Sequence, residues 1–301
     1  MENGGSLARI YVISDIHLEM RSLEMSREIN IFPYDAHEIP RYLAMCGDIG
    51  NPCSPNYLEF LERHSKLFDH ILIVAGNHEY YSKAEQRSIS EIDHVLFQIA
   101  SSLPNVTYLQ ETKVTLGNIT FAGCTLWTAV DSSCERKMND YQHIFMDDEA
   151  VSETRILYPA MDTSQSNMFG SSLMAPMNKP VFLNPYKRPL RWLDVLETHQ
   201  RHCEWLQDVI DTCENKLVVL THHAPSRKML RPEFRNEGNS AYASECDHLF
   251  KSPLVCWMSG HTHYSSTVHI NDIPCVSNCH GYPHETYENT KAKCGYFVEI
   301  E

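Results

Sequence analysis

The feature that most constrains the fold is a layout that recurs five times: a short, β-branched apolar run ends abruptly in a turn of Gly, Asp, Asn or His. These runs cover residues 10–13, 42–46, 71–75, 217–220 and 254–258. Short apolar runs bounded by turn residues are typical of buried strands. Because the polar turns all follow strand ends, we expect them to meet at one rim of a sheet, where open α/β folds bind ligands.

The stretches between these runs predict the remaining architecture. Helical periodicity marks residues 56–68, 83–100, 189–213 and 243–250, and further short strands are expected at 105–109, 113–116, 119–127, 267–270, 274–277 and 296–300. This count predicts an α/β fold of the four-layer sandwich type. Two mixed β-sheets would pack face to face between helices, with a metal site at the carboxyl ends of the strands.

The domain organisation follows from length and from one break in the pattern. A chain of 301 residues can bury most of its surface in one domain, so we expect a single domain over 1–301. Residues 145–188 are rich in Pro, Met, Ser and Asn and form an insertion. A loop of this length is typical of a lid, a binding loop or a disordered segment.

Charge and cysteine content limit the function classes. With 25 Lys and Arg against 39 Asp and Glu, the net charge of −14 repels long nucleic acids. The first residues resemble neither a signal peptide nor a lipid anchor, and no apolar run is long enough to span a bilayer, so we expect a cytoplasmic protein without a membrane partner. The 11 cysteines form no Cys-x-x-Cys pair, which favours buried, reduced thiols over zinc-finger or disulfide roles.

Five polar motifs follow the predicted strands in order. They are Asp15-x-His17, Gly47-Asp48, Gly76-Asn77-His78-Glu79, His222-His223 and Gly260-His261-x-His263. The two-residue motifs are common by chance, whereas the longer ones would occur together with a probability on the order of one in several thousand. The set therefore indicates one site rather than scattered structural histidines.

The donor atoms of these motifs suit divalent transition metals. Two carboxylates, one amide oxygen and several imidazoles form a mixed nitrogen and oxygen set that fits Mn, Fe, Zn or Ni better than Ca. Asp48, placed just after a glycine turn, is suited to bridging two cations. Two cations, two carboxylates and one hydroxide leave a local charge of about +1, which attracts an anionic phosphate even in an acidic chain.

In this order, the five motifs resemble the signature of the calcineurin-like metallophosphoesterase superfamily. The resemblance spans Asp15 to His263. It implies two divalent cations, the first held by Asp15, His17 and His263, the second by Asn77, His222 and His261, with Asp48 bridging them. It also implies that His78 stabilises the phosphoryl group or protonates the leaving oxygen while a metal-bridging hydroxide attacks phosphorus. His222 is preferred over His223 as the ligand because the family usually places the ligand first in this pair.

Several neighbouring residues have two readings. Arg227, Lys228 and Arg231, together with His223, are candidate substrate contacts, although a solvated basic loop would explain the three cations equally well. Glu79 could orient His78, but a favourable interaction with a helix N-terminus is the preferred explanation.

The predicted function is hydrolysis of a phosphomonoester or phosphodiester. The acidic surface favours a small anionic substrate such as a nucleotide, a cyclic nucleotide or a phosphorylated metabolite, and it disfavours long nucleic acid. Two alternatives stay open: a scaffold with the same fold that has lost catalysis, and a nuclease that acts on short single-stranded ends.

Overall fold

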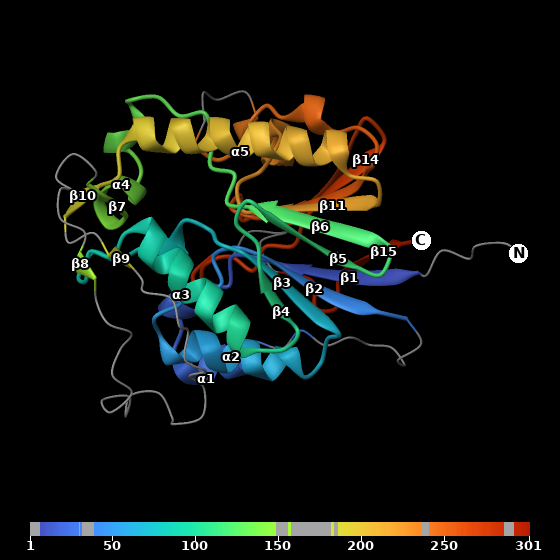
Figure 1. Ribbon diagram of the computed structural model, residues 1–301, viewed down its shortest axis with the longest axis horizontal. Helices are drawn as coiled ribbons and strands as arrows, with labels where there is room; N and C mark the ends of the chain where they lie inside the picture. The colour runs from blue at the N-terminus through green and yellow to red at the C-terminus, as the bar shows by residue number, and fades with distance from the viewer. Residues whose placement is uncertain are drawn as a thin grey trace, which may run out of the picture.

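The structure is a computed structural model of the whole chain. It describes residues 7–29, 31, 39–148, 156–157, 182–183, 186–235, 241–285 and 292–301. These ranges contain all the motifs identified in the sequence. Figure 1 shows the arrangement of helices and strands.

The first sheet has the strand order β15-β1-β2-β3-β4. Its strands are β1 (Ala8–Ile13), β2 (Arg41–Cys46), β3 (His70–Val74), β4 (Val106–Tyr108) and β15 (Phe297–Ile300). The first four strands run parallel, and β15 pairs antiparallel with β1 at the edge. The loops that follow β1, β2 and β3 therefore leave the sheet at the same rim.

The second sheet has the order β13-β14-β12-β11-β6-β5. Its strands are β5 (Thr112–Leu116), β6 (Ile119–Cys124), β11 (Lys216–Thr221), β12 (Leu254–Ser259), β13 (Ser266–Ile270) and β14 (Ile273–Ser277). The four central strands are parallel, and both edge strands are antiparallel. Both sheets are thus mixed, as the sequence predicts.

The alternation of side chains along each strand explains why the two sheets form the inner layers of the sandwich. Ile10 and Val12 of β1 join a buried cluster with residues of β11 and β12, whereas Tyr11 and Ile13 belong to a second cluster on the opposite face. Successive side chains of a strand point to opposite faces, so each sheet is apolar on both sides and needs two covering layers.

Helices form the outer layers (Figure 1). The helices α2 (Pro55–Ser65) and α3 (Ile89–Ser102) cover the first sheet, with α1 (Leu23–Glu28) beside α2, and α5 (Trp192–Thr212) covers the second sheet. Ser88 and Glu91 form a capping box that begins α3. The predicted sandwich of two mixed sheets flanked by helices is confirmed.

One predicted helix is wrong. The segment 243–250 contains only the short 3-10 helix η8 (Asp247–Leu249), and its first half forms isolated bridges from Ala243 to Ala224 and from Glu245 to Ser226. Apolar residues of this segment pack into the core beneath α5. The helical spacing therefore reflects burial of one side of an extended segment. The remaining 3-10 helices are η1 (Leu18–Met20), η2 (His78–Tyr80), η3 (Cys134–Arg136), η6 (Arg227–Met229) and η7 (Pro232–Phe234).

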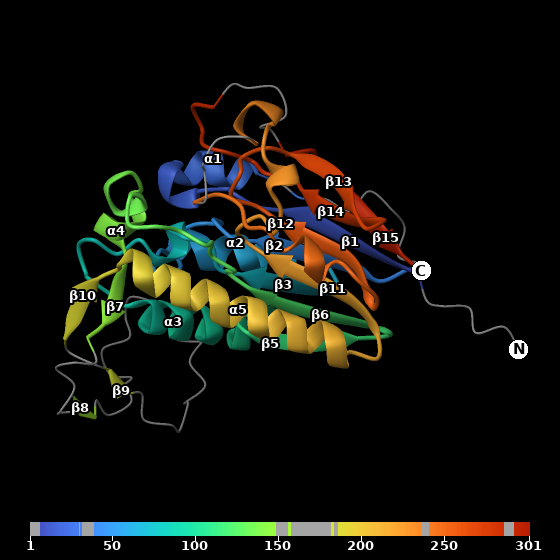
Figure 2. The same cartoon turned by 90° about the horizontal axis from the view of Figure 1, so that it is seen from above.

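The two ends of the predicted insertion are paired with each other. Strand β7 (Phe145–Asp147) pairs antiparallel with β10 (Lys187–Pro189), next to the short helix α4 (Asp140–His143). Between them lie the paired strands β8 (Ile156–Leu157) and β9 (Phe182–Leu183). Figure 2 shows α4, β7 and β10 at the end of the molecule opposite the C-terminus. The rest of the insertion, and with it the prediction of a lid or disordered loop, lies outside the described residues.

Two further sequence predictions concern single segments and side chains. In the part of the chain that the structure describes, no helix combines the length and apolarity needed to cross a bilayer. The eleven cysteines, all of which lie within the described residues, form no disulfide.

Candidate metal centre

The predicted ligand residues lie in loops with an unusual backbone. Asp15, His17, Asp48, His261 and His263 all have positive φ angles, between 46° and 66°. Non-glycine residues rarely adopt this left-handed conformation, because Cβ approaches the carbonyl oxygen. Strained backbone of this kind persists where the surroundings hold it in place and is concentrated at functional sites.

Hydrogen bonds between the loops hold this geometry. The amide of Asp15 donates to the carbonyl of Gly47 at 3.0 Å, and the amide of His17 donates to the carbonyl of Asp48 at 2.9 Å. The side chain of Asp48 in turn accepts the amide N–H of His78 at 2.8 Å. The loops after β1, β2 and β3 therefore form one connected unit.

Gly76 shows how closely these loops approach. A Cβ atom added at Gly76 would collide with the carboxylate of Asp48 and lie 2.6 Å from its backbone nitrogen. Only glycine leaves room for Asp48 at this point.

The first group of side chains joins β1 to the loop after β12. The Nε2 atom of His263 lies 3.3 Å from Oδ1 of Asp15 and 3.2 Å from Nε2 of His17. Nε2 of His17 is 3.7 Å from Oδ2 of Asp48. Asp15, His17 and His263 are close enough together to hold one cation between them.

The second group surrounds His222. Its Nε2 atom lies 3.4 Å from Oδ1 of Asp48, 3.0 Å from Oδ1 of Asn77 and 3.1 Å from Nδ1 of His261. Asp48, His222 and His261 form a group that could hold a second cation. Asp48 thus directs one carboxylate oxygen toward each group, which is the arrangement required of a bridging ligand.

The outer atoms of the imidazoles and of the amide are also placed for ligation. In each of the four imidazoles, the ring nitrogen that faces away from the group has an oxygen within hydrogen-bond reach. For His222 this oxygen is the carbonyl of Cys46, and for His261 it is the carbonyl of Ala241. For His17 it belongs to the carboxylate of Glu19, and for His263 to that of Glu285. An N–H donated to that oxygen leaves the lone pair of the other nitrogen free for a metal. The amide of Asn77 donates to Asp140 at 2.8 Å, so that its oxygen points inward.

The charges of the centre favour cations. Burial alone would raise the pKa of Asp15, but the imidazole of His263 lowers it below its ordinary value. Burial likewise opposes ionisation of Asp48, and the charge of His222 lowers its pKa well below the usual range. Burial disfavours protonation of His222, yet the carboxylate of Asp48 raises its pKa to about 9. Two buried, ionised carboxylates require positive charge beside them; protonated imidazoles supply it here, and divalent cations held by the same side chains would supply it in their place.

His78 lies at the edge of this centre with three polar or aromatic neighbours. Its Nδ1 atom is 3.0 Å from Oε1 of Glu19, its Nε2 atom is 3.1 Å from the hydroxyl of Tyr282, and its ring stacks on Tyr81 at 4.2 Å. It is also close enough to His17 and Asp48 to form a third possible ligand group with them. Burial lowers the pKa of His78, but the charges of Asp48 and Glu19 raise it above its ordinary value.

Glu79 has a different role from the one the sequence favours. It does lie in a helical first turn, but its fully buried carboxylate accepts backbone N–H groups from the neighbouring loop: Asp48 at 2.9 Å and Ile49 at 2.7 Å, in addition to Gly76 at 2.7 Å. It therefore ties the loop after β2 to the loop after β3. Burial and the nearby charge of Asp48 raise the pKa of Glu79 to about 7.

The predicted substrate contacts occupy different environments. His223 is buried, has the carbonyl of Thr125 3.2 Å from its Nδ1 atom, and packs against the ring of His261 at 4.1 Å. Lys228 forms a surface ion pair with Asp247 at 2.9 Å. Arg227 donates to the carbonyl of Arg235, and Arg231 reaches the carbonyl of His263 at 3.5 Å. Of the three cations, Arg231 is thus placed directly beside a predicted ligand.

Four residues near the centre were missed as participants by sequence reasoning. They are Glu19, Asp140, Tyr282 and Glu285, each of which contacts a predicted ligand or His78. Glu19 lies two residues after His17, and Asp140 and Tyr282 belong to short motifs, Met138-Asn139-Asp140-Tyr141 and Asn278-x-x-Gly281-Tyr282. The position of Glu19 two residues after a predicted ligand could have identified it as a neighbour of the centre. The sequence around Glu285 offers no such indication.

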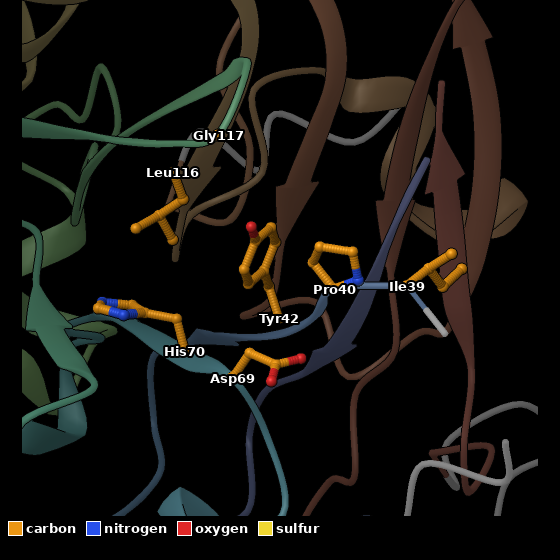
Figure 3. Close-up of a pocket in the computed structure, with 7 residues that line it drawn as sticks. All are labelled: Ile39, Pro40, Tyr42, Asp69, His70, Leu116 and Gly117. Atoms are coloured by element: carbon orange, nitrogen blue, oxygen red, sulfur yellow. The ribbon is translucent and has the colours of Figure 1, made fainter. Parts of the chain in front are cut away.

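A separate hollow lies away from this centre (Figure 3). It has a volume of about 500 Å³ and is lined by Ile39, Pro40, Tyr42, Asp69, His70, Leu116 and Gly117. Pro40 and Asp69 precede β2 and β3, so the hollow lies at the opposite strand ends from the predicted ligands. None of the residues of the five polar motifs lines it.

Comparison with known proteins agrees with this geometry. A family model described as calcineurin-like phosphoesterase matches residues 8–265. The uncharacterized protein L509 of Acanthamoeba polyphaga mimivirus is 28% identical over 293 residues, which is 91% of each chain. The crystal structure of phosphopantetheinyl hydrolase from Mycobacterium tuberculosis covers 98% of this chain and 96% of its own, with a TM-score of 0.58 and 14% identity, which shows a shared fold. The chain belongs to the calcineurin-like phosphoesterase family.

Proposed function

We propose that this protein is a phosphoesterase that uses two divalent cations to hydrolyse small phosphate esters. The observation that carries the proposal is the position of Asp48, whose two carboxylate oxygens face two separate ligand groups. Asp15, His17 and His263 would hold one cation, and Asn77, His222 and His261 the other. The mixed nitrogen and oxygen donors favour Mn, Fe, Zn or Ni. When bound, such cations supply a positively charged phosphate site and lower the pKa of a coordinated water.

His78 is suited to act on the leaving group. A protonated imidazole can stabilise negative charge on the phosphoryl group or donate a proton to the leaving oxygen. The carboxylate of Glu19 holds Nδ1 of His78 in position, and Nε2 faces the hydroxyl of Tyr282. The carboxylate of Glu19 also lies 3.1 Å from Nδ1 of His17, so it links His78, the proposed proton donor, to one of the proposed metal ligands.

The proposed substrate is a small anionic phosphate ester, such as a nucleotide, a cyclic nucleotide or a phosphorylated metabolite. The net charge of −14 opposes binding of long nucleic acids, while the cations attract phosphate locally. Of the three predicted basic substrate contacts, Arg231 lies beside the predicted ligand His263 and is the one we expect to contact an anion at the rim. We further propose a cytoplasmic enzyme that acts without a membrane partner.

Metal-dependent turnover tests the proposal. Metal-stripped protein receives Mn, Fe, Zn or Ni, and hydrolysis of bis-p-nitrophenyl phosphate is compared with that of p-nitrophenyl phosphate. We expect turnover to need added metal and to disappear in Asp48→Asn, which keeps the shape but removes the bridging charge. The matched control is Asp211→Asn, because Asp211 forms an exposed ion pair with Lys251. Equal activity of Asp48→Asn and the parent would contradict the proposal.

The same variants distinguish the alternatives. His78→Ala is expected to lower kcat by about 10²–10⁴-fold with the metals retained. A folded protein that binds two metals but turns over no ester would indicate a scaffold. Salt-sensitive binding of short single-stranded oligonucleotides, followed by their cleavage, would indicate a nuclease.

A further inference from the structure

A second cluster of metal-binding side chains lies under the helix that covers the second sheet. His199 and Cys203 are one turn apart on α5 and so lie on the same face of the helix. Cys246 approaches them from the segment that precedes η8. Among the described residues, this is the one group of potential metal ligands that contains cysteine.

The spacing of these atoms matches that of a tetrahedral zinc site. Sγ of Cys203 lies 3.7 Å from Sγ of Cys246 and 3.6 Å from Nε2 of His199. Zinc bond lengths of about 2.3 Å to sulfur and about 2.05 Å to nitrogen give tetrahedral edges of about 3.8 Å and about 3.6 Å. A disulfide would instead require sulfur atoms about 2.05 Å apart.

The orientation and burial of the side chains agree with ligation. Nδ1 of His199 lies 3.1 Å from the carbonyl of Leu126 and 3.7 Å from Sγ of Cys203, so an N–H donated to the carbonyl leaves Nε2, 3.6 Å from the same sulfur, as the ring nitrogen available to a metal. His199 is 7% exposed and Cys246 is 2% exposed, whereas Cys203 is partly open to solvent. The half-open side would leave a fourth position for water.

We propose that His199, Cys203 and Cys246 form a third metal site, which binds zinc and is separate from the two-cation centre. Two thiolates and one imidazole are soft ligands that select zinc over Mg, Ca or Mn.

The position of the site indicates a structural role. The amide of Cys246 donates to the carbonyl of Pro225, which closely follows His222, and the carbonyl of Ala241 faces Nε2 of His261. A zinc ion would therefore fasten α5 to the segment that supports two ligands of the other centre. Its removal should loosen that segment and lower thermal stability.

Cobalt provides a selective test. The proposed ligands of the two-cation centre contain no sulfur, so a thiolate-to-cobalt charge-transfer band in the near ultraviolet reports on the third site alone. We expect full-length protein reconstituted with Co²⁺ to show this band. Cys203→Ser and Cys246→Ser should abolish it and lower the zinc content by one ion per chain. Cys213→Ser is the matched control, because Cys213 caps the same helix outside the cluster.

A second measurement uses unmodified protein and so does not depend on the folding of the variants. A mercurial reagent that blocks the thiols should release one zinc ion per chain, detected by a metallochromic dye. Absence of the cobalt band together with no zinc release from the unmodified protein would overturn the proposal. So would a Cys203–Cys246 disulfide found by mass spectrometry in protein prepared under reducing conditions.

Discussion

The buried imidazole of His64 should make the stability of this fold depend on pH. His64 lies in α2, its Nδ1 atom is 2.8 Å from the carbonyl of Phe60, and its Nε2 atom accepts the amide N–H of Ile31 at 3.3 Å. Burial lowers the pKa of His64 from 6.5 to about 4. The folded state therefore binds fewer protons than the unfolded state between these values. The stability contributed by neutral His64 is complete above pH 6.5 and is lost as the pH falls toward 4.

The size of this effect follows from the two pKa values. Lowering the pH from 7.5 to 5 should remove about 2 kcal/mol of the stability contributed by His64. The assay is urea unfolding of the parent and of His64→Gln at both pH values. We expect the parent to be the more stable protein at pH 7.5 and its advantage to shrink by about 2 kcal/mol at pH 5.

Comparison of variants separates His64 from the other titrating groups. Protons that compete with metals affect the parent and His64→Gln alike, so they cancel in the difference. His94→Gln is the control, because His94 hydrogen-bonds to Gln98 at the surface of α3. A free-energy difference between parent and His64→Gln that is the same at both pH values would refute the reasoning.

Three further predictions concern the centre itself. Glu79→Gln places an NH₂ group against backbone N–H donors, so we expect the variant to hold fewer than two metal ions per chain, as measured by elemental analysis. Glu19→Gln removes a negative charge that raises the pKa of His78. The alkaline limb of the kcat–pH profile should therefore move to lower pH, and an unchanged profile would argue against His78 as the acid. Gly76→Ala forces a methyl group against the bridging carboxylate and should abolish metal-dependent turnover. Gly117→Ala, where nothing lies within 4 Å of the added carbon, should retain that turnover.

The parts of the molecule that the sequence predicts well depend on local patterns. The apolar run at 42–46 and the following Gly47-Asp48 predict both β2 and the position of Asp48. Residues that directly follow a buried strand must lie at its carboxyl end, which is at the edge of the sheet. The same logic places His222 after β11. Seven predicted ligands meet because their strands are parallel within each sheet and the two sheets face each other.

Contacts between distant segments escape such reasoning. Glu79 looks like an ordinary first-turn acid until β2 and β3 are known to be neighbours, since its additional partners belong to the loop after β2. Cys203 and Cys246 are separated by 43 residues, and no short motif joins them. The segment 243–250 was predicted as a helix because its apolar spacing is compatible with either one buried helix face or an extended segment against the core.

The left-handed backbone at five predicted ligands has a consequence for how such a protein can evolve. Each of these residues costs on the order of 1 kcal/mol relative to glycine, and a folded domain retains only about 5–15 kcal/mol in total. Glycine at one of these positions would relieve that strain, but at Asp48 it would also leave the buried amide N–H of His78 without its acceptor. The rest of the fold must therefore supply the stability that keeps these five residues in the left-handed conformation, and the contacts of each side chain decide which of them can change.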